Sequence, residues 1–193
     1  MKYIISGTNR PQSRTRKVAE FIQKLYLELG EETEIIDLAD VGLEQLAAAA
    51  PYGDAMPEKM RAAIEKINGA DGLIVVCPEY NGSMPGALKY FIDHWSYPAS
   101  FEFRPVAFVG IGMRFGALRP VEHLQGVFGY RNAFIYPERV FIANAHTVFN
   151  DEGRLVDEQI IGLLRSQAKG FQAFTKALSA AGLDANSRLR AKK

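Results

Sequence analysis

The residues best suited to binding a ligand lie in the stretch 77–93, C-P-E-Y-N-G-S-M-P-G-A-L-K-Y-F-I-D. This stretch follows an apolar run, 72–76, that is typical of a strand buried on both faces, and it continues into a segment with helical spacing. In an open parallel sheet, ligands bind outside the carboxyl ends of the strands. Pro78 stiffens the loop, Gly82 permits close backbone approach, and Asn81 offers both a donor and an acceptor. The loop therefore favours a flat ligand with polar edges, although an ordinary strand-to-helix connection would use similar residues.

A second polar loop, G-T-N-R-P-Q-S-R-T, follows the first apolar strand. An apolar helical stripe starts at about Arg14, so hydroxyl and amide side chains precede a helix N-terminus. The free N–H groups and positive dipole end of a helix bind phosphate, and a guanidinium strengthens such a site. We expect one terminal phosphate to be held by an arginine and several hydroxyls: Arg10, Thr8, Ser13 and Thr15. The alternative is a cluster of helix caps with no ligand.

Other kinds of reactive site find little support. The first loop matches neither G-x-x-x-x-G-K-[ST] nor G-x-G-x-x-G, which argues against a nucleoside triphosphatase and against a dinucleotide pyrophosphate. The G-x-S-x-G elbow of many hydrolases is missing. His94, His123 and His146 are widely spaced, so we expect no metal site. Cys77 ends the buried strand, where a small core side chain is favoured over a nucleophile.

With both loops in view, the chain resembles the NADPH-dependent FMN reductase family, a flavodoxin-like group that includes quinone, azo-dye and chromate reductases. The family's first loop, G-S-x-R-x-x-S, is matched by residues 7–13, with threonine for serine at Thr8. Its second loop, P-E-Y-N-x-S-x-P-G-x-L-K-x-x-I-D, is matched by residues 78–93 nearly residue for residue. A third, glycine-rich loop is matched in part by residues 110–117, where Phe115 occupies a position that is often glycine.

The resemblance covers residues 2–178 and implies an enzyme that transfers a hydride from NADPH or NADH through N5 of FMN. The implied acceptor is a small molecule: a quinone, an azo dye, free flavin or a metal oxyanion. The resemblance implies no catalytic side chain, because the flavin carries the chemistry, and donor and acceptor would use one flavin face in turn by a ping-pong mechanism. The implied FMN-binding residues come from all three loops: Thr8, Arg10, Ser13, Arg14, Thr15, Pro78, Glu79, Tyr80, Asn81, Gly82, Gly112, Arg114 and Gly116.

Two other functions stay open at this stage. One is a non-enzymatic FMN electron carrier of the flavodoxin type. Such carriers usually have a T-x-T-G-x-T phosphate loop and strong acidity, and this chain has neither. The other is a flavin-free protein that kept the fold as an interaction scaffold.

Strand and helix patterns alternate along the chain. We expect strands at 2–6, 33–37, 72–76, 105–111 and 139–143, and helices at 14–29, 57–68, 86–95, 118–128 and 157–181. This alternation predicts an α/β fold with a parallel sheet and helices on both faces. Five strands fit the doubly wound, flavodoxin-like order 2-1-3-4-5, in which strands one and three flank the ligand-binding switch point. The two polar loops follow these two strands.

Composition sets the remaining expectations. The 193 residues fit one domain, 1–182, followed by a basic tail, 183–193, that we expect to be disordered. The 23 basic and 22 acidic side chains nearly balance, which argues against a nucleic-acid-binding face. A single cysteine, no signal peptide and no membrane-length apolar run predict a cytoplasmic protein with no membrane partner.

Aromatic residues crowd the helix that follows the second loop: Tyr90, Phe91, Trp95 and Tyr97. We expect some of them to be exposed and to form a homodimer or homotetramer interface, the alternative being that all pack on the sheet. The long connection 41–56 is expected either to wall the substrate entrance or to pack on a neighbouring subunit.

Overall fold

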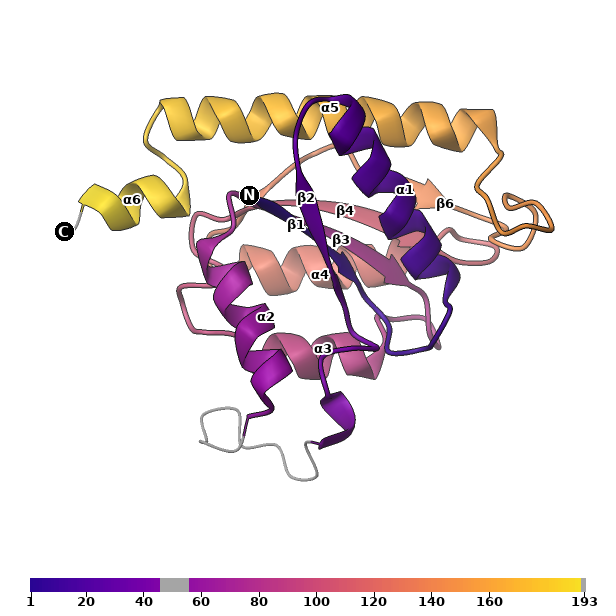
Figure 1. Cartoon of the computed structure of the whole chain (residues 1–193), viewed down its shortest axis with the longest axis horizontal. Helices are drawn as coiled ribbons and strands as arrows, with labels where there is room; N and C mark the ends of the chain where they lie inside the picture. The colour runs from indigo at the N-terminus through magenta and orange to yellow at the C-terminus, as the bar shows by residue number, and fades with distance from the viewer. Residues whose placement is uncertain (46–55, 192–193) are drawn as a thin grey trace.

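The computed structural model describes residues 1–45 and 56–191, which form a parallel sheet with helices on both faces (Figure 1). The strand order is β2-β1-β3-β4-β5, as predicted, and β6 also pairs with β4. The strands are β1 (Lys2–Ser6), β2 (Thr33–Asp37), β3 (Gly72–Pro78), β4 (Pro105–Ile111), β5 (Phe134–Ile135) and β6 (Val140–Ile142). The helices are α1 (Arg14–Glu28), α2 (Glu58–Gly69), α3 (Gly86–Asp93), α4 (Leu118–Gly129), α5 (Glu158–Ala180) and α6 (Ala185–Ala191), with a 3₁₀ turn η1 (Leu43–Gln45).

The two faces of the sheet carry separate apolar cores. Ile74 and Val76 of β3 pack with α1 and α5, whereas Leu73 and Val75 pack with α2, α3 and α4 (Figure 1). Because both faces of β3 and β4 are buried, these strands are continuous apolar runs rather than alternating ones. All the strands run the same way, so the loops that follow them gather at one edge of the sheet. Residues 46–55 of the long connection lie outside the described part of the chain.

The fifth strand position is divided between two short strands, which corrects the prediction of one strand at 139–143. β5 and β6 pair with the two ends of β4 in turn. Pro137 lies between them and has no N–H with which to continue the ladder. The side-chain amide of Gln167 from α5 fills this gap, since its Nε2 donates to the carbonyls of Phe108 and Glu138 at 2.9 Å each.

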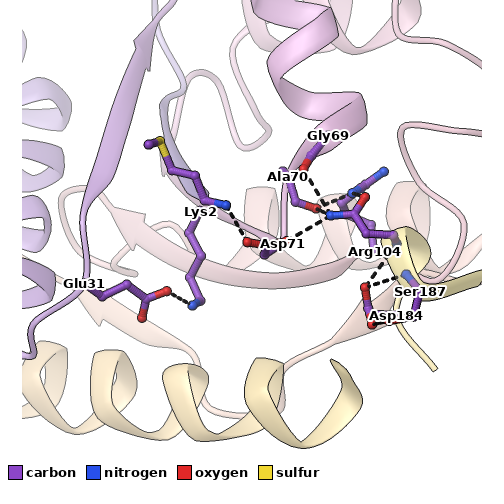
Figure 2. A network of polar contacts seen from close by, with 10 residues as sticks. Lys2, Glu31, Gly69, Ala70, Asp71, Arg104, Asp184 and Ser187 are labelled. Atoms are coloured by element: carbon purple, nitrogen blue, oxygen red, sulfur yellow. Dashed lines mark hydrogen bonds and ion pairs between the residues drawn. The ribbon is translucent and has the colours of Figure 1, made fainter. Parts of the chain in front are cut away.

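The C-terminal segment contains a helix, α6, where the sequence predicted a disordered tail from residue 183. Asp184 begins this helix, because its Oδ1 accepts from the N–H groups of Asn186 at 3.0 Å and Ser187 at 3.1 Å. The Asn186 side chain also donates to the Gly69 carbonyl at 3.1 Å, at the end of α2. These polar contacts dock α6 on the edge of the sheet opposite the polar loops (Figures 1 and 2).

A buried arginine explains why this docking was not predicted. Arg104 precedes β4 and is fully buried, and burial lowers the pKa of its guanidinium to about 10, so it stays charged at neutral pH. Its Nη2 donates to the carbonyls of Asn68 at 2.7 Å and Ala99 at 3.0 Å, while Nη1 donates to the carbonyl of Ala70. Nη1 also contacts Asn186 of α6 at 3.4 Å. Figure 2 shows Arg104 beside Ala70, with Asp184 and Ser187 of the α6 segment nearby. A basic tail alone gives no sign of such a long-range partner.

Candidate functional site

The two polar loops lie side by side where β1 and β3 end. Ser6 and Val76 form the last register pair of these strands. Beyond it, the Gly7 N–H donates to the Val76 carbonyl at 2.9 Å, and a Cβ on Gly7 would lie 2.7 Å from that oxygen. Only glycine therefore allows this approach. The Thr8 hydroxyl and the Tyr80 phenol are hydrogen-bonded at 2.9 Å, which joins the first loop to the second.

Helix α1 begins directly after the first loop, with Ser13 as its N-cap. The Ser13 hydroxyl accepts from the Arg16 N–H at 3.1 Å, so the cap interpretation is correct for this residue. The backbone N–H groups of Arg14 and Thr15 find no acceptor among the described residues. The first turn of α1 also has no acidic side chain. Free N–H groups at the positive end of a helix dipole attract an anion to this point.

A cavity of about 440 Å³ opens at the start of α1. Its size lies within the range of small-molecule sites, about 300–1,000 Å³. It is lined by both polar loops and by residues at or beyond the ends of β4 and β6: Arg10, Pro11, Gln12, Ser13, Arg14, Thr15, Lys17, Pro78, Tyr80, Ile111 and Ala145. Three of these side chains are cationic and none is acidic. The cavity is therefore suited to a ligand with a negatively charged end.

The three cationic side chains of the cavity form no ion pair within residues 1–45 and 56–191. Their neighbour Arg16 differs, because it pairs with Glu20 at 2.9 Å and with Asp37 at 3.2 Å. Arg10 and Arg14 are exposed and Lys17 is half-buried, so the three charges give the opening a positive potential that attracts an anion. The difference between Arg16 and its neighbours thus marks the cavity as a site for an anion.

The cavity contains only part of the predicted site and also residues that were missed. Six predicted residues line it: Arg10, Ser13, Arg14, Thr15, Pro78 and Tyr80. Five others were not predicted: Pro11, Gln12, Lys17, Ile111 and Ala145. For Lys17 a signal existed, since it lies one helical turn after Arg14 and so shares its face. For Ala145 the sequence contains no such signal, because the position of this residue depends on where β6 ends.

Asn81 and Gly82 form a tight turn at the rim instead of lining the cavity. Both have positive φ, 51° and 78°, and the N–H groups of Tyr80 and Ser83 each donate to the other's carbonyl, at 2.9 and 3.1 Å. This is the pattern of a type I′ turn, which favours Asn-Gly. The Ser83 hydroxyl lies 2.9 Å from Nδ1 of His123 on α4, so the turn is fastened to the neighbouring helix. His123 therefore has a structural partner.

The glycines of the third loop shape its backbone. A Cβ on Gly112 would lie 2.9 Å from the Ala117 nitrogen, and one on Gly116, where φ is +57°, would lie 3.1 Å from Cβ of Phe141. The Gly112 N–H donates to the Ile142 carbonyl at 3.0 Å, which ties the loop to β6. These contacts fold the loop back over the sheet edge, beside the second loop but outside the cavity lining.

Phe115, which stands where the family often has glycine, lies on the surface with about half of it exposed. The guanidinium carbons of Arg114 and Arg119 lie 5.6 and 4.9 Å from its ring centroid. Arg119 also pairs with Glu79 of the second loop at 3.5 Å. Phe115 and Arg114 thus form part of an outer surface that adjoins the second loop.

Among the residues that the structure describes, Cys77 and the possible metal-binding side chains give no sign of a second reactive site. Cys77 is fully buried, and burial raises the pKa of its thiol, so it is protonated at neutral pH. Nowhere in the described ranges do three or more His, Cys, Asp or Glu side chains gather as metal ligands would. Of the helices described, none combines the length and apolar character needed to cross a membrane.

Comparison with known sequences supports the resemblance inferred from the loops. A sequence model described as NADPH-dependent FMN reductase matches residues 3–147. The chain therefore belongs to the NADPH-dependent FMN reductase family. An NAD(P)H-dependent FMN reductase of Pseudomonas aeruginosa is 32% identical over 147 residues, covering 74% of this chain and 80% of that protein. An FMN-dependent NADPH-azoreductase of Staphylococcus aureus is 28% identical, covering 78% and 80%.

Solved structures confirm the fold of this family member. The flavoenzyme NAD(P)H:(acceptor) oxidoreductase FerB of Paracoccus denitrificans matches with a TM-score of 0.72 and 23% identity, covering 91% of this chain and 97% of that one. Flavodoxin 2 of Bacillus cereus matches with a TM-score of 0.61 and 16% identity, covering 90% and 99%. The fold is therefore flavodoxin-like, and family membership makes the chain an oxidoreductase that uses FMN and NAD(P)H.

The residues of the cavity fit FMN. Unpaired cations and free helix N–H groups suit its single phosphate, and no acidic side chain among the lining residues opposes it. In the adjoining second loop the N–H groups of Asn81 and Gly82 find no acceptor among the described residues, so they can serve a flat ring with a polar edge.

Proposed function

We propose that the cavity at the start of α1 holds FMN and that the enzyme passes a hydride from NADPH or NADH to a small-molecule acceptor. The acceptor class is a quinone, an azo dye, free flavin or a metal oxyanion. The observation that carries this proposal is the position and charge of the cavity. It lies where the two hydrogen-bonded loops follow β1 and β3, and its three cationic side chains have no ion-pair partner in the described chain. FMN would supply the redox chemistry at its N5 atom, so no protein side chain has to act as acid, base or nucleophile.

The first loop would bind the phosphate. Arg10 and Arg14 would provide positive charge, and Ser13 and Thr15 would provide hydroxyl and backbone N–H donors. Thr8 has a different role from the one first expected, since its hydroxyl is buried, accepts from the Arg10 N–H at 3.3 Å and bonds Tyr80. We assign Thr8 as a positioning residue that holds the two loops in register.

The second and third loops would hold the ring. We propose that the backbone of Pro78–Gly82 lies along its polar edge, with Asn81 able to bond it from the rim. Gly112, Arg114 and Gly116 would bound the other side, with Arg114 at the outer surface. One ring face would stay open to donor and acceptor, which would occupy it in turn.

We expect the purified protein to bind about one FMN per chain. Replacing Arg10 and Ser13 by alanine should each weaken FMN binding by about tenfold or more, because a charged hydrogen bond contributes roughly 1.5–3 kcal/mol. Arg16→Ala is the matched control, since Arg16 faces Glu20 and Asp37 and should leave the affinity unchanged. Flavin fluorescence titration measures the affinities. An R10A/S13A double variant with parental FMN affinity would contradict the phosphate assignment.

Turnover tests the enzymatic function itself. With FMN bound, NADPH oxidation should be slow without an acceptor and fast with a quinone, because the acceptor re-oxidises the enzyme. Double-reciprocal plots at several quinone concentrations should give parallel lines, since donor and acceptor exchange at one place. Intersecting lines would instead require separate places for the two. A flavodoxin-type carrier, the alternative function, would show no quinone-stimulated NADPH oxidation.

We also propose that two copies of the chain associate through the face formed by α3 and α4. Of the crowded aromatic residues, Phe91 and Trp95 are buried and Tyr97 is 55% exposed, as the expectation that some are exposed allows. Tyr97 and Tyr130, which is 77% exposed, lie beside a groove of about 330 Å³. The Trp95 Nε1 and Arg131 Nε atoms are buried without an acceptor in the described part of the chain. Both atoms are enclosed by the chain itself, whereas the exposed tyrosines beside the groove are the kind of side chain that subunit interfaces bury.

Light scattering should give about twice the 21.4 kDa chain mass, or four times it for a tetramer. Tyr97→Ser combined with Tyr130→Ser should shift the protein toward the monomer by removing exposed aromatic contacts. Leu27→Ser removes a similarly exposed apolar side chain from α1 and should not change the mass. A parent protein that is monomeric at micromolar concentration would overturn this proposal.

We further propose one domain, which covers the expected residues 1–182 and also the docked α6, and a cytoplasmic location. Dependence on NAD(P)H and a single, buried cysteine support the location.

A further inference from the structure

Lys17 is the one charged cavity residue that the phosphate assignment leaves without a role. It lies in the second turn of α1 on the face that lines the cavity, with its N–H bonded to the Ser13 carbonyl at 3.3 Å. No carboxylate of the described chain lies within ion-pair distance of its amine. A structural lysine on a helix surface would normally lie in solvent or pair with an acid one turn away, as Arg16 does with Glu20.

A small hairpin after β6 determines where the Lys17 amine lies. Phe149 and Leu155 form its bridge, and the Gly153 N–H donates to the Asn150 carbonyl at 2.8 Å. At Gly153 φ is +74°, and a Cβ there would lie only 2.0 Å from Nζ of Lys17. The amine therefore rests against the Gly153 backbone in space that any side chain would occupy. The hairpin lies past residue 147, where the family match ends.

The acidic residues of this hairpin do not neutralise the amine. Glu152 pairs with Arg154 at 3.0 Å, and both Asp151 and Glu152 are exposed. The charge of Lys17 is therefore available to the cavity, where it adds to those of Arg10 and Arg14. A phosphate monoester carries about −1.5 to −2 charges at neutral pH, since its second pKa is about 6.

We propose that Lys17 is a third phosphate-binding cation of the flavin site, positioned by the Gly153 backbone. This inference rests on the proposed function, because it assigns Lys17 to the phosphate of the FMN bound there. Lys17 then distinguishes FMN from riboflavin, which has the same ring and no phosphate. The hairpin after β6 becomes part of the cofactor site through one main-chain contact.

The test compares FMN and riboflavin binding to Lys17→Met and to Lys24→Met. Lys24 is exposed on the same helix, so K24M removes an equal charge away from the cavity. K17M should weaken FMN binding by about tenfold or more and leave riboflavin binding within about twofold. K24M should leave both within about twofold, and K17R, which keeps the charge, should retain a preference for FMN. Circular dichroism confirms that each variant is folded.

Gly153→Ala tests the positioning. The added Cβ must displace the Lys17 amine, so FMN affinity should change in the parent and stay the same in the K17M background. Equal FMN affinity in parent and K17M, or an equal loss for FMN and riboflavin, would overturn the inference while leaving the proposed function standing. A parent that binds neither flavin would overturn the proposed function, and this inference with it.

Discussion

The close approach of the main chain at Gly7 to the end of β3 is the contact on which the site depends. A Cβ on Gly7 would meet the Val76 carbonyl, so the two strands can separate into their loops this close together only with glycine there. The same closeness lets Thr8 reach Tyr80 and form the hydrogen bond between the loops. The helix N-terminus after the first loop and the tight turn in the second are consequently presented to one cavity.

The charge distribution follows from this geometry. Elsewhere on α1 the basic side chain of Arg16 finds carboxylates, but those that face the cavity do not. Three such cations at one opening, with no acidic side chain among the lining residues, produce a local positive potential that favours a bound anion. Across the sheet, at the ends of the strands remote from the loops, Arg104 instead donates to the Ala70 carbonyl (Figure 2) and contacts Asn186 of α6. Arginine side chains thus face the candidate ligand site at one end of the strands and hold helix α6 at the other.

Much of the fold could be predicted because local pattern and topology agreed. The strands at 33–37 and 105–111 were predicted to the residue, and the helix boundaries to within about two residues. The fifth strand was predicted as one piece at 139–143, and β5 was missed. Pro137 interrupts the strand, and the side chain that bridges the interruption, Gln167, lies far along the chain. The α6 helix was missed for a related reason, since Asn186 holds it in place through long-range contacts with Arg104 and Gly69.

The candidate site, too, was predicted correctly only where local sequence pattern determines it. Motif residues such as Arg10, Ser13 and Tyr80 were predicted because loops after neighbouring parallel strands must meet. Asn81 and Gly82 were expected beside the ligand for their hydrogen-bonding groups and flexibility, whereas their immediate role is the backbone of a type I′ turn. Lys17 could have been found from helical spacing, but its contact with Gly153 depends on a hairpin that no local pattern places there.

The central claim is that this cavity holds an FMN that NAD(P)H reduces directly. Anaerobic addition of one equivalent of NADPH to the FMN-loaded protein, with no acceptor present, tests it most directly by following the visible flavin absorbance. The absorbance should bleach within the time of one catalytic turnover and return when quinone is added. Protein that holds FMN yet stays oxidised under NADPH would contradict the account and identify the chain as a carrier.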